Sequence, residues 1–501
     1  MKRASTSANS HSMVCKVGIV GGLGSLAGGD LFHKLLKSQA VLEDQERFHF
    51  LFEQHPFSGL SLPLEQGASM TSRKFYVFDV CKTFERSGVD VVLLPCFASH
   101  TFRDEIQQEL AIPVLDLMDA LSRHLEQTVA SGTTLGVMAS DFVRHSGLFE
   151  KHLADRLNLV YPSADEQTSL MHAVYEADGI KHGQLEGAAV EAVYRVGLSL
   201  QSRGATLVVP GMTELSLVCS ALQWRGVALL DANALYANAA TRDRGPVNRP
   251  PFKLGIVGGV GPAATVDFIG KVVRHTPATR DQQHIKMVVE QNPQIPDRTA
   301  HLLHGETDPT LALFATCKRL ESAGAEAIAI PCNTAHAFVA RIQPHLHIPI
   351  VNMLTQTLEW IVKTHGRSAT VGLLATSGTV HSQVYQAVAG DFGVQIIVPR
   401  PDYQHLVMEA IYGERGIKAG FTDGLCKTQL LLAAEHLCEV GARVLILGCT
   451  ELPLVLEHDP QFNLNGHTVA LVDPTTLLAL SCISRVPGIQ SGTACDPTRP
   501  G

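Results

Sequence analysis

The sequence lacks the features that would direct it to a membrane or to nucleic acid. No run of about 18 or more residues is continuously apolar, so no membrane-spanning helix is expected. No cluster of lysine and arginine is long enough for a nucleic-acid surface, and the formal net charge is -8. The first twelve residues are polar and lack the apolar core of a signal peptide. We therefore expect a cytoplasmic protein that binds small molecules, with no nucleic acid or membrane as partner.

The chain also lacks the cysteine and histidine patterns of a zinc site. No Cys-x-x-Cys pair is present, and cysteines and histidines do not cluster at metal-ligand spacing. The eleven cysteines are an odd number scattered through strand-like and helix-like patterns, which favours reduced thiols over a disulfide framework. We expect no structural metal. Four cysteines in helical patterns are expected to be small core residues: Cys317, Cys426, Cys438 and Cys482.

What the chain does contain is a tandem repeat. Four motifs recur in the same order: Gly-Ile-Val-Gly-Gly (18–22 and 255–259), Pro-Cys (95–96 and 331–332), Gly-Ile-Lys (179–181 and 416–418) and Gly-x-Thr-Glu-Leu (211–215 and 448–452). The offset between the copies stays at 236 or 237 residues. Two halves with so constant an offset are expected to share one fold.

The repeat sets the expected domain limits. We predict one domain at 14–237, a linker at 238–251 that is rich in arginine and proline, a second domain at 252–485 and a loose tail at 486–501.

In the second half, short apolar segments alternate with longer helical patterns. Strands are expected at 254–257, 286–289, 327–330, 370–374, 395–398 and 444–447. Helices are expected between them, for example at 309–323 and 423–440. Such alternation predicts parallel βαβ units. The expected fold class is therefore α/β, with two doubly wound parallel-sheet lobes in each half and a cleft between the lobes.

Two cysteines follow buried strands. Cys332 comes after an apolar run and Pro331, and Cys449 comes after an apolar run and Gly448. Open α/β sheets bind their ligands at the carboxyl ends of the strands. Each cysteine should also lie at a helix N-terminus, whose dipole favours a thiolate. Because the two strands are 117 residues apart, about half of one repeat, we expect one cysteine on each wall of the cleft and an acid/base pair between them.

Several polar residues near these strands have two interpretations each. Arg298 lies in a proline-stiffened loop and offers a planar fork for a carboxylate, but a single loop arginine is often solvated surface. Lys418 lies between glycines that allow close approach, yet lysines usually face solvent. Thr376 and Thr379, in a hydroxyl-rich turn, could cap a helix or bind a ligand. His336 could be catalytic or simply satisfied within a helix.

Two other enzyme classes fit less well. Gly259-x-Gly261-x-x-Ala264 follows a strand like a dinucleotide-binding motif, but Glu290 lies 31 residues after Gly259, where about 20 is usual, and Pro262 begins the next helix. A tight turn lining a small-molecule site explains these glycines better. A Ser-His-Asp hydrolase is not indicated, because no Gly-x-Ser-x-Gly follows a strand.

Together these motifs resemble the aspartate/glutamate racemase family of cofactor-independent amino-acid racemases, and its aspartate branch in particular. The resemblance covers 253 to about 483 through six motifs in order: Gly-Ile-Val-Gly-Gly-x-Gly-Pro, Asn-Pro-Gln-Ile-Pro-Asp-Arg, Pro-Cys-Asn-Thr-Ala-His, Leu-Leu-Ala-Thr-x-Gly-Thr-Val, Gly-Ile-Lys-Ala-Gly and Gly-Cys-Thr-Glu. Glutamate racemases usually carry histidine where this chain has Glu451, which favours the aspartate branch.

The resemblance implies a racemase that interconverts L- and D-aspartate, with glutamate as the alternative substrate, and needs no pyridoxal phosphate or other cofactor. One cysteine of the pair Cys332 and Cys449 would remove the α-proton as a thiolate, and the other would deliver a proton to the opposite face as a thiol. Arg298 and Lys418 would bind the side-chain carboxylate. The implied substrate-binding set is Arg298, Asn333, Thr334, Thr376, Thr379, Lys418, Thr450 and Glu451.

The first half departs from this pattern. Cys96 and Lys181 remain, but Met212 replaces the second cysteine, Ser61 stands where Arg298 would be, and Phe97-Ala98 replace Asn-Thr. A thioether cannot exchange protons, so we expect this half to be degenerate and to bind a ligand, regulate, or pair with the second half.

The implied partner is a small acidic amino acid. Because family members commonly form dimers, we also expect an intrachain pseudo-dimer, with further self-association open. Two alternatives remain: a non-catalytic dicarboxylate-binding or regulatory protein, and an isomerase or decarboxylase of the same superfamily.

Overall fold

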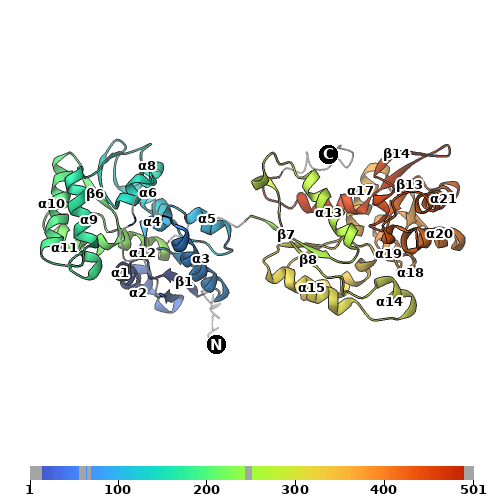
Figure 1. Cartoon of the computed structure of the whole chain (residues 1–501), viewed down its shortest axis with the longest axis horizontal. Coiled ribbons are helices and arrows are strands. Elements are labelled where there is room, and N and C mark those ends of the chain that lie inside the picture. Colours follow the sequence, from blue (N-terminus) through green and yellow to red (C-terminus); the bar gives the residue numbers. More distant parts are fainter. Residues whose placement is uncertain (1–13, 56–63, 65–68, 243–250, 490–501) are drawn as a thin grey trace, which may run out of the picture. The chain divides into compact units, whose positions relative to one another are not determined.

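The computed structural model describes residues 14–55, 64, 69–242 and 251–489 (Figure 1). The chain divides into two compact units, Met1–Pro250 and Pro251–Gly501. Helix α12 (Ala232–Arg242) covers the first five residues of the expected linker, so the linker begins later than the sequence suggested. The rest of the linker up to residue 250 and the expected tail beyond Ile489 lie outside the described residues.

The first unit contains two small parallel sheets. β1 (Cys15–Val20) lies between β2 (Phe48–Glu53) and β3 (Val91–Leu93), and β4 (Thr134–Ala139) lies between β5 (Asn158–Val160) and β6 (Leu207–Gly211). Every pairing within these two sheets is parallel. The expected α/β fold with two parallel-sheet lobes is confirmed for this half.

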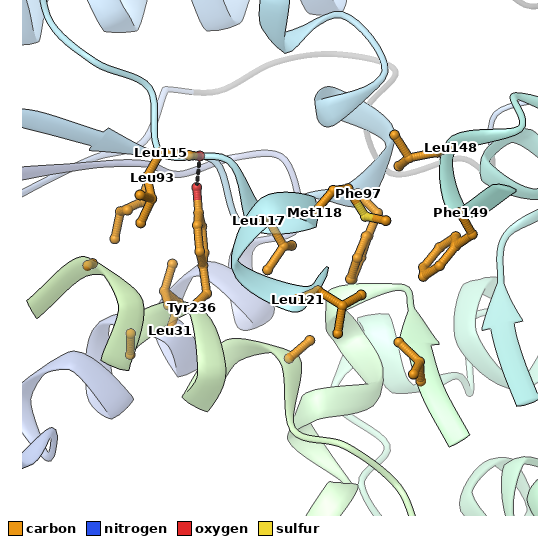
Figure 2. Close-up of a cluster of buried hydrophobic side chains, with 14 of the residues drawn as sticks. Leu31, Leu93, Phe97, Leu115, Leu117, Met118, Leu121, Leu148, Phe149 and Tyr236 are labelled. Atoms are coloured by element: carbon orange, nitrogen blue, oxygen red, sulfur yellow. Dashed lines mark hydrogen bonds between the residues drawn. The ribbon is translucent and has the colours of Figure 1, made fainter. Parts of the chain in front are cut away.

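One hydrophobic cluster joins the two sheets of the first unit. It contains Leu93 of β3 and Val137 of β4 together with aromatic residues from the connecting helices (Figure 2). Tyr236 of α12 is fully buried there and donates a hydrogen bond to the Leu115 carbonyl at 2.6 Å. The bond removes the cost of burying the phenol hydroxyl, so α12 is fixed against both lobes.

The second unit begins with a four-stranded parallel sheet in the order β10-β9-β7-β8. Its strands are β7 (Lys253–Gly258), β8 (Lys286–Gln291), β9 (Ala327–Ala329) and β10 (Ile350–Val351). Helices α13 (Pro262–His275) and α15 (Thr310–Ser322) lie on opposite sides of this sheet (Figure 1). Alternate strand residues pack into two separate clusters, which explains why the strands read as continuous apolar runs.

The second sheet of this unit has the order β12-β11-β13-β15-β14. β11 (Thr370–Leu374) and β13 (Val444–Leu447) have the predicted bounds, and β12 spans Gln395–Ile397. The sequence analysis missed β14 (Asp459–Leu464) and β15 (His467–Val472), which form the one antiparallel pair among the described strands. The tight turn between these two strands has positive φ at Asn465 and Gly466. Because the two strands pair antiparallel, this sheet is mixed, whereas a purely parallel sheet was predicted.

Helix α22 (Pro474–Ile483) returns from β15 to pack against α13 and the first sheet. Asp473 caps this helix and is 1% exposed, and Lys271 of α13 lies 2.7 Å from its carboxylate. The buried pair ties the two lobes of the second unit together. Within the described part of the chain, no helix is both long enough and apolar enough to cross a membrane.

Candidate functional site

The residues singled out in the sequence converge on one cavity in the second unit. Its empty volume is about 290 Å³. The lining contains both cysteines and seven of the eight polar candidates: Cys332, Cys449, Arg298, Asn333, Thr334, Thr376, Lys418, Thr450 and Glu451. Thr379 is not in the lining but shares a 2.8 Å hydrogen bond with Thr334. The two thiols therefore face a common space.

The strand ends place the cysteines. Cys332 follows β9 and Cys449 follows β13, each at the carboxyl end of its parallel strand. No α-helix begins directly after either cysteine. A 3₁₀ segment, η5 (Thr334–Phe338), follows Cys332, and another, η8 (Leu452–Leu454), follows Cys449. Such short segments carry little dipole, so the expectation of a helix N-terminus at each cysteine was wrong and side chains must supply the electrostatics.

Cys449 has an acidic partner. Its thiol donates a hydrogen bond to Glu451 Oε2 at 3.0 Å, and Lys418 Nζ lies 2.9 Å from Glu451 Oε1. Burial, and then the Glu451 carboxylate, raise the pKa of Cys449 well above its usual value, although Lys418 opposes them. The protein therefore holds Cys449 as a thiol, which is a proton donor.

Cys332 has a basic neighbour instead. Burial lowers the pKa of Arg298, but the nearby charge of Cys332, and then that of Asp297, raise it overall. Arg298 Nη1 donates to the carbonyls of Ile295 and Pro296 at 3.4 and 3.2 Å, which fixes the guanidinium beside the cavity. Arg298 thus lines the cavity beside Cys332 while Glu451 contacts Cys449, so the two cysteines have neighbours of opposite charge.

Two buried donors at the cavity have no partner among the described residues. They are Arg298 Nε and Asn333 Nδ2. Tyr385 donates to Asn333 Oδ1 at 2.6 Å, so the amide oxygen is occupied and its NH₂ group is left to the cavity. Buried donors are normally satisfied, so this pair points to an acceptor-rich ligand such as a carboxylate.

Hydroxyl groups connect the two lobes beside these donors. Thr334 bonds to Thr376 at 3.2 Å as well as to Thr379, and Thr299 donates to Thr376 at 3.4 Å. Thr376 also caps helix α18 (Ser377–Ser382) by accepting from the Thr379 amide. Thr376 therefore caps a helix, as one interpretation had it, and it also lines the cavity; ligand binding by this turn stays a prediction.

Lys418 and His336 differ in their surroundings. Burial lowers the pKa of Lys418, but Glu451, Tyr412 and Cys449 raise the pKa overall, so the lysine stays charged. Its ammonium group lies 5.1 Å from the Tyr412 ring centroid. Burial lowers the pKa of His336 to about 4. Its Nδ1 lies 2.9 Å from the Cys332 carbonyl, and its Nε2 accepts a hydrogen bond from the Met353 amide. His336 is therefore a neutral structural residue that holds the backbone at Cys332.

The glycine-rich turn after β7 has a steric cause. Gly259 and Gly261 have φ values of 86° and 124°, which favour glycine. A Cβ at Gly259 would lie 2.3 Å from the Asn292 backbone, and one at Gly261 would lie 2.8 Å from Glu451 Oε1. Glu290, the residue expected to hold a ribose in a dinucleotide site, instead accepts a hydrogen bond from Arg319 at 2.7 Å. The turn thus brings the backbone close to Glu451.

The sequence analysis missed three residues of the cavity lining: Val260, Thr299 and Tyr412. Val260 lies inside the quoted glycine-turn motif, and Thr299 directly follows the quoted motif that ends at Arg298. Tyr412 ends helix α20 (Pro401–Tyr412), and its repeat counterpart is Tyr175. The shared tyrosine at an offset of 237 residues was the available signal.

The first unit has a matching cavity lined by Cys96, Lys181 and Met212. Ser61, which stands in the position of Arg298, lies outside the described residues. An arginine is nevertheless present, because Arg73 from helix α3 (Thr71–Arg86) reaches Cys96 Sγ at 3.5 Å. The cavity of this half therefore has an arginine that comes from another element than the position of Ser61.

Among the described residues, one cluster has ligand atoms close enough together to bind a metal ion. Asp116, Asp119 and His152 offer ligand atoms within 4.8 Å of one another. Asp116 already caps helix α6 (Leu117–Thr128) and lies 3.6 Å from His100 Nδ1. These contacts give the carboxylate a structural role.

Comparison with known proteins gives one family for both halves. A model of the Asp/Glu/Hydantoin racemase family matches residues 20–240 and again residues 257–482. RacX, a broad specificity amino-acid racemase of Bacillus subtilis, is 27% identical over 243 residues, which is 48% of this chain and 100% of that protein. A glutamate racemase of Corynebacterium kroppenstedtii is 32% identical over 138 residues, 27% of this chain and 45% of that one.

A solved structure is similar to about half of the chain. Picrophilus torridus aspartate racemase matches with a TM-score of 0.40 and 28% identity, over 46% of this chain and 93% of its own.

Proposed function

The chain belongs to the Asp/Glu/hydantoin racemase family in both of its halves, and from that premise we propose that the second half racemises aspartate, with glutamate as the alternative substrate. Cys332 and Cys449 are its two bases. The observation that carries this proposal is the placement of two thiols in one cavity with opposite neighbours, Arg298 beside one and Glu451 beside the other.

The chemical difficulty is the weak acidity of the α-proton beside a carboxylate. Removing it places negative charge on the α-carbon and its carboxylate, and the protein must stabilise that charge in the transition state. The Asn333 NH₂ group, which has no partner among the described residues, and the Thr334 hydroxyl line the cavity and are able to donate to the α-carboxylate; the Thr450 hydroxyl donates to Glu451 Oε2 at 3.3 Å. They stabilise the carbanion without changing their own protonation.

The proton transfers balance between the two thiols. In one direction the Cys332 thiolate takes the α-proton, and the Cys449 thiol gives its proton to the opposite face of the carbanion. The product leaves the pair inverted, with a thiol on Cys332 and a thiolate on Cys449, and Lys418 stabilises the latter through its charge. Proton exchange with water, or a turnover in the reverse direction, restores the first state.

The resting preference for one state has a kinetic consequence. The enantiomers have equal free energy in water, so kcat/KM must be the same in both directions. A resting enzyme with a Cys449 thiol binds one enantiomer productively and must invert its protons before it accepts the other. We expect kcat and KM to differ between the enantiomers while their ratio does not.

Two cations support an acidic substrate. Arg298 and Lys418 both line the cavity, and only Glu451 opposes them there as a fixed anion. Arg298, whose Nε has no partner among the described residues, is suited to bind the second carboxylate of such a ligand. The names of the similar proteins span aspartate, glutamate and broad specificity, so the substrate range is to be measured over several amino acids.

The test is racemisation by the full chain of each enantiomer of aspartate, glutamate and alanine, without added cofactor, followed by chiral chromatography. Cys332→Ala and Cys449→Ala supply the loss-of-function pair. Cys317→Ala is the matched control, because this thiol lies in the core on α15. Racemisation that survives in either site variant would refute the two-base assignment.

The alternative, a dicarboxylate-binding protein without catalysis, predicts a different result. It would bind aspartate and racemise neither enantiomer. The oppositely charged neighbours of the two thiols favour catalysis, because a site that only binds a dicarboxylate has no need of a thiol proton donor facing a second thiol.

A further inference from the structure

The cavity of the first unit keeps its charges although it has lost its second thiol. Its empty volume is about 380 Å³, and its lining includes Arg73, Cys96, Lys181 and Glu214. With two cations and one carboxylate, these side chains carry the same fixed charge as Arg298, Lys418 and Glu451 of the second unit. A cavity that had become mere packing would be expected to lose such buried charges, because each one is expensive to bury.

Arg73 is the strongest sign of a ligand. It is only 6% exposed, and its Nη1 contacts the sulfur of Cys96 at 3.5 Å. Its Nε has no hydrogen-bond partner, and no carboxylate lies within ion-pair distance of it among the residues that the structure describes. Within the described residues, this buried guanidinium with one weak sulfur acceptor lacks the anion that would normally compensate it. Arg298 shows the same unpartnered Nε in the other unit.

Lys181 repeats the arrangement of Lys418. Its Nζ lies 3.4 Å from Glu214 Oε1 and 4.9 Å from the Tyr175 ring centroid. Its distance to the glutamate is longer than the 2.9 Å of the pair Lys418–Glu451. The ammonium is thus held at the cavity by a loose ion pair and an aromatic face, with donors left for an anion.

The remaining lining explains why such an anion would not react. Met212 is buried at the position of the second base and has no proton to give. Phe97, where the second unit has Asn333, packs against Phe149 with ring centroids 5.6 Å apart (Figure 2). Thr213 donates to the Pro95 carbonyl at 3.0 Å. The donors that would stabilise a carbanion are absent or occupied.

We propose that the first unit holds a second binding site, in which Arg73 and Lys181 bind a small carboxylate anion that is not converted. The arginine comes from helix α3, whereas Arg298 is the first residue of helix α14 (Arg298–His304), so the site is built around a different element. The proposal goes beyond racemisation in the second unit and does not depend on it.

Cys96 makes the site measurable in the full chain. Its thiol is partly exposed, so iodoacetamide should alkylate it, and peptide mass spectrometry separates it from Cys332 and Cys449. The probe is succinate, a dicarboxylate without an α-amino group, with uncharged succinamide as the matched control. At a succinate concentration about ten times Kd, alkylation of Cys96 should slow about tenfold, and succinamide should leave it unchanged.

Substitution of Arg73 provides the second arm. Each variant is compared with itself, with and without succinate, because the arginine also affects the reactivity of Cys96. Arg73→Leu should abolish the protection of Cys96 by succinate, and Arg73→Lys, which keeps the charge and loses the fork, should weaken it. Circular dichroism establishes that each variant is folded.

Three results would overturn the proposal: no protection of Cys96 by succinate, equal protection by succinamide, or protection that survives in a folded Arg73→Leu variant. Failure of racemisation would leave the Cys96 measurement intact, so the two claims are separable.

Discussion

Glu451→Gln should make the Cys449 thiol more acidic and so move the alkaline limit of catalysis to lower pH. The active pair carries one proton, and loss of that proton ends two-base transfer. In the native protein, burial and Glu451 raise the pKa of Cys449, so kcat/KM for aspartate should show no alkaline decline near the usual pKa of a thiol. Glutamine keeps the size of the side chain and removes its charge.

The size of this effect follows from the contact between the two groups. At 3.0 Å and an effective dielectric constant of about 20, a carboxylate and a thiolate repel by roughly 5 kcal/mol. Lys418, 2.9 Å from the other carboxylate oxygen, cancels part of this repulsion in the native protein. Its charge acts alone in the variant. We therefore expect the pKa to fall by at least about one unit, or 1.4 kcal/mol.

The assay is the pH profile of kcat/KM for aspartate racemisation, followed by circular dichroism. Alkylation of the Cys449 peptide as a function of pH reports the same pKa without turnover. Glu457→Gln is the matched control, because Glu457 is an exposed carboxylate in the same unit. An alkaline limit in Glu451→Gln that is unchanged, or displaced to higher pH, would refute this account of Cys449.

Three further predictions concern the same unit. Cys332→Ala and Cys449→Ala should each lower racemisation by about 10²–10⁴-fold while Cys317→Ala does not, as chiral chromatography can measure. Arg298→Leu should lower aspartate kcat/KM at least about tenfold, since a charge-assisted contact contributes roughly 1.5–3 kcal/mol; equal losses on alanine would contradict a role in side-chain recognition. The folded-state pKa of His336, about 4, lies below its unfolded value of about 6.5. The neutral histidine therefore contributes about 3 kcal/mol to the free energy of unfolding above about pH 6.5, and this contribution is lost as the pH falls toward 4. Urea unfolding of His336→Asn should lack this part of the acid dependence.

The sequence predicted the placement of the two cysteines because strand, turn and thiol are adjacent in the chain. It could not predict the 3₁₀ segments that follow, since short 3₁₀ and α-helical turns share composition and length. The antiparallel hairpin after β13 was predictable. Asn465-Gly466 is a strong two-residue turn signal, and both residues have positive φ.

Contacts that depend on the positions of side chains in space could not be predicted from the sequence. Arg73 lies 23 positions before Cys96 on a helix, and an alignment of the two halves shows only Ser61 in place of Arg298. Glu451 was named as substrate-binding, whereas its hydrogen bond to Cys449 adds an effect on the base itself. The pairing of the two halves as an intrachain pseudo-dimer stays a prediction.

Racemisation of L-aspartate in D₂O tests the central claim most directly. Two separate thiols imply that the proton removed goes to one cysteine while the product receives solvent deuterium from the other. Early in the reaction, D-aspartate should therefore carry deuterium at the α-carbon, and the remaining L-aspartate should keep its protium. Deuterium that enters both enantiomers at the same rate, or no conversion of aspartate or glutamate at all, would contradict the two-base assignment.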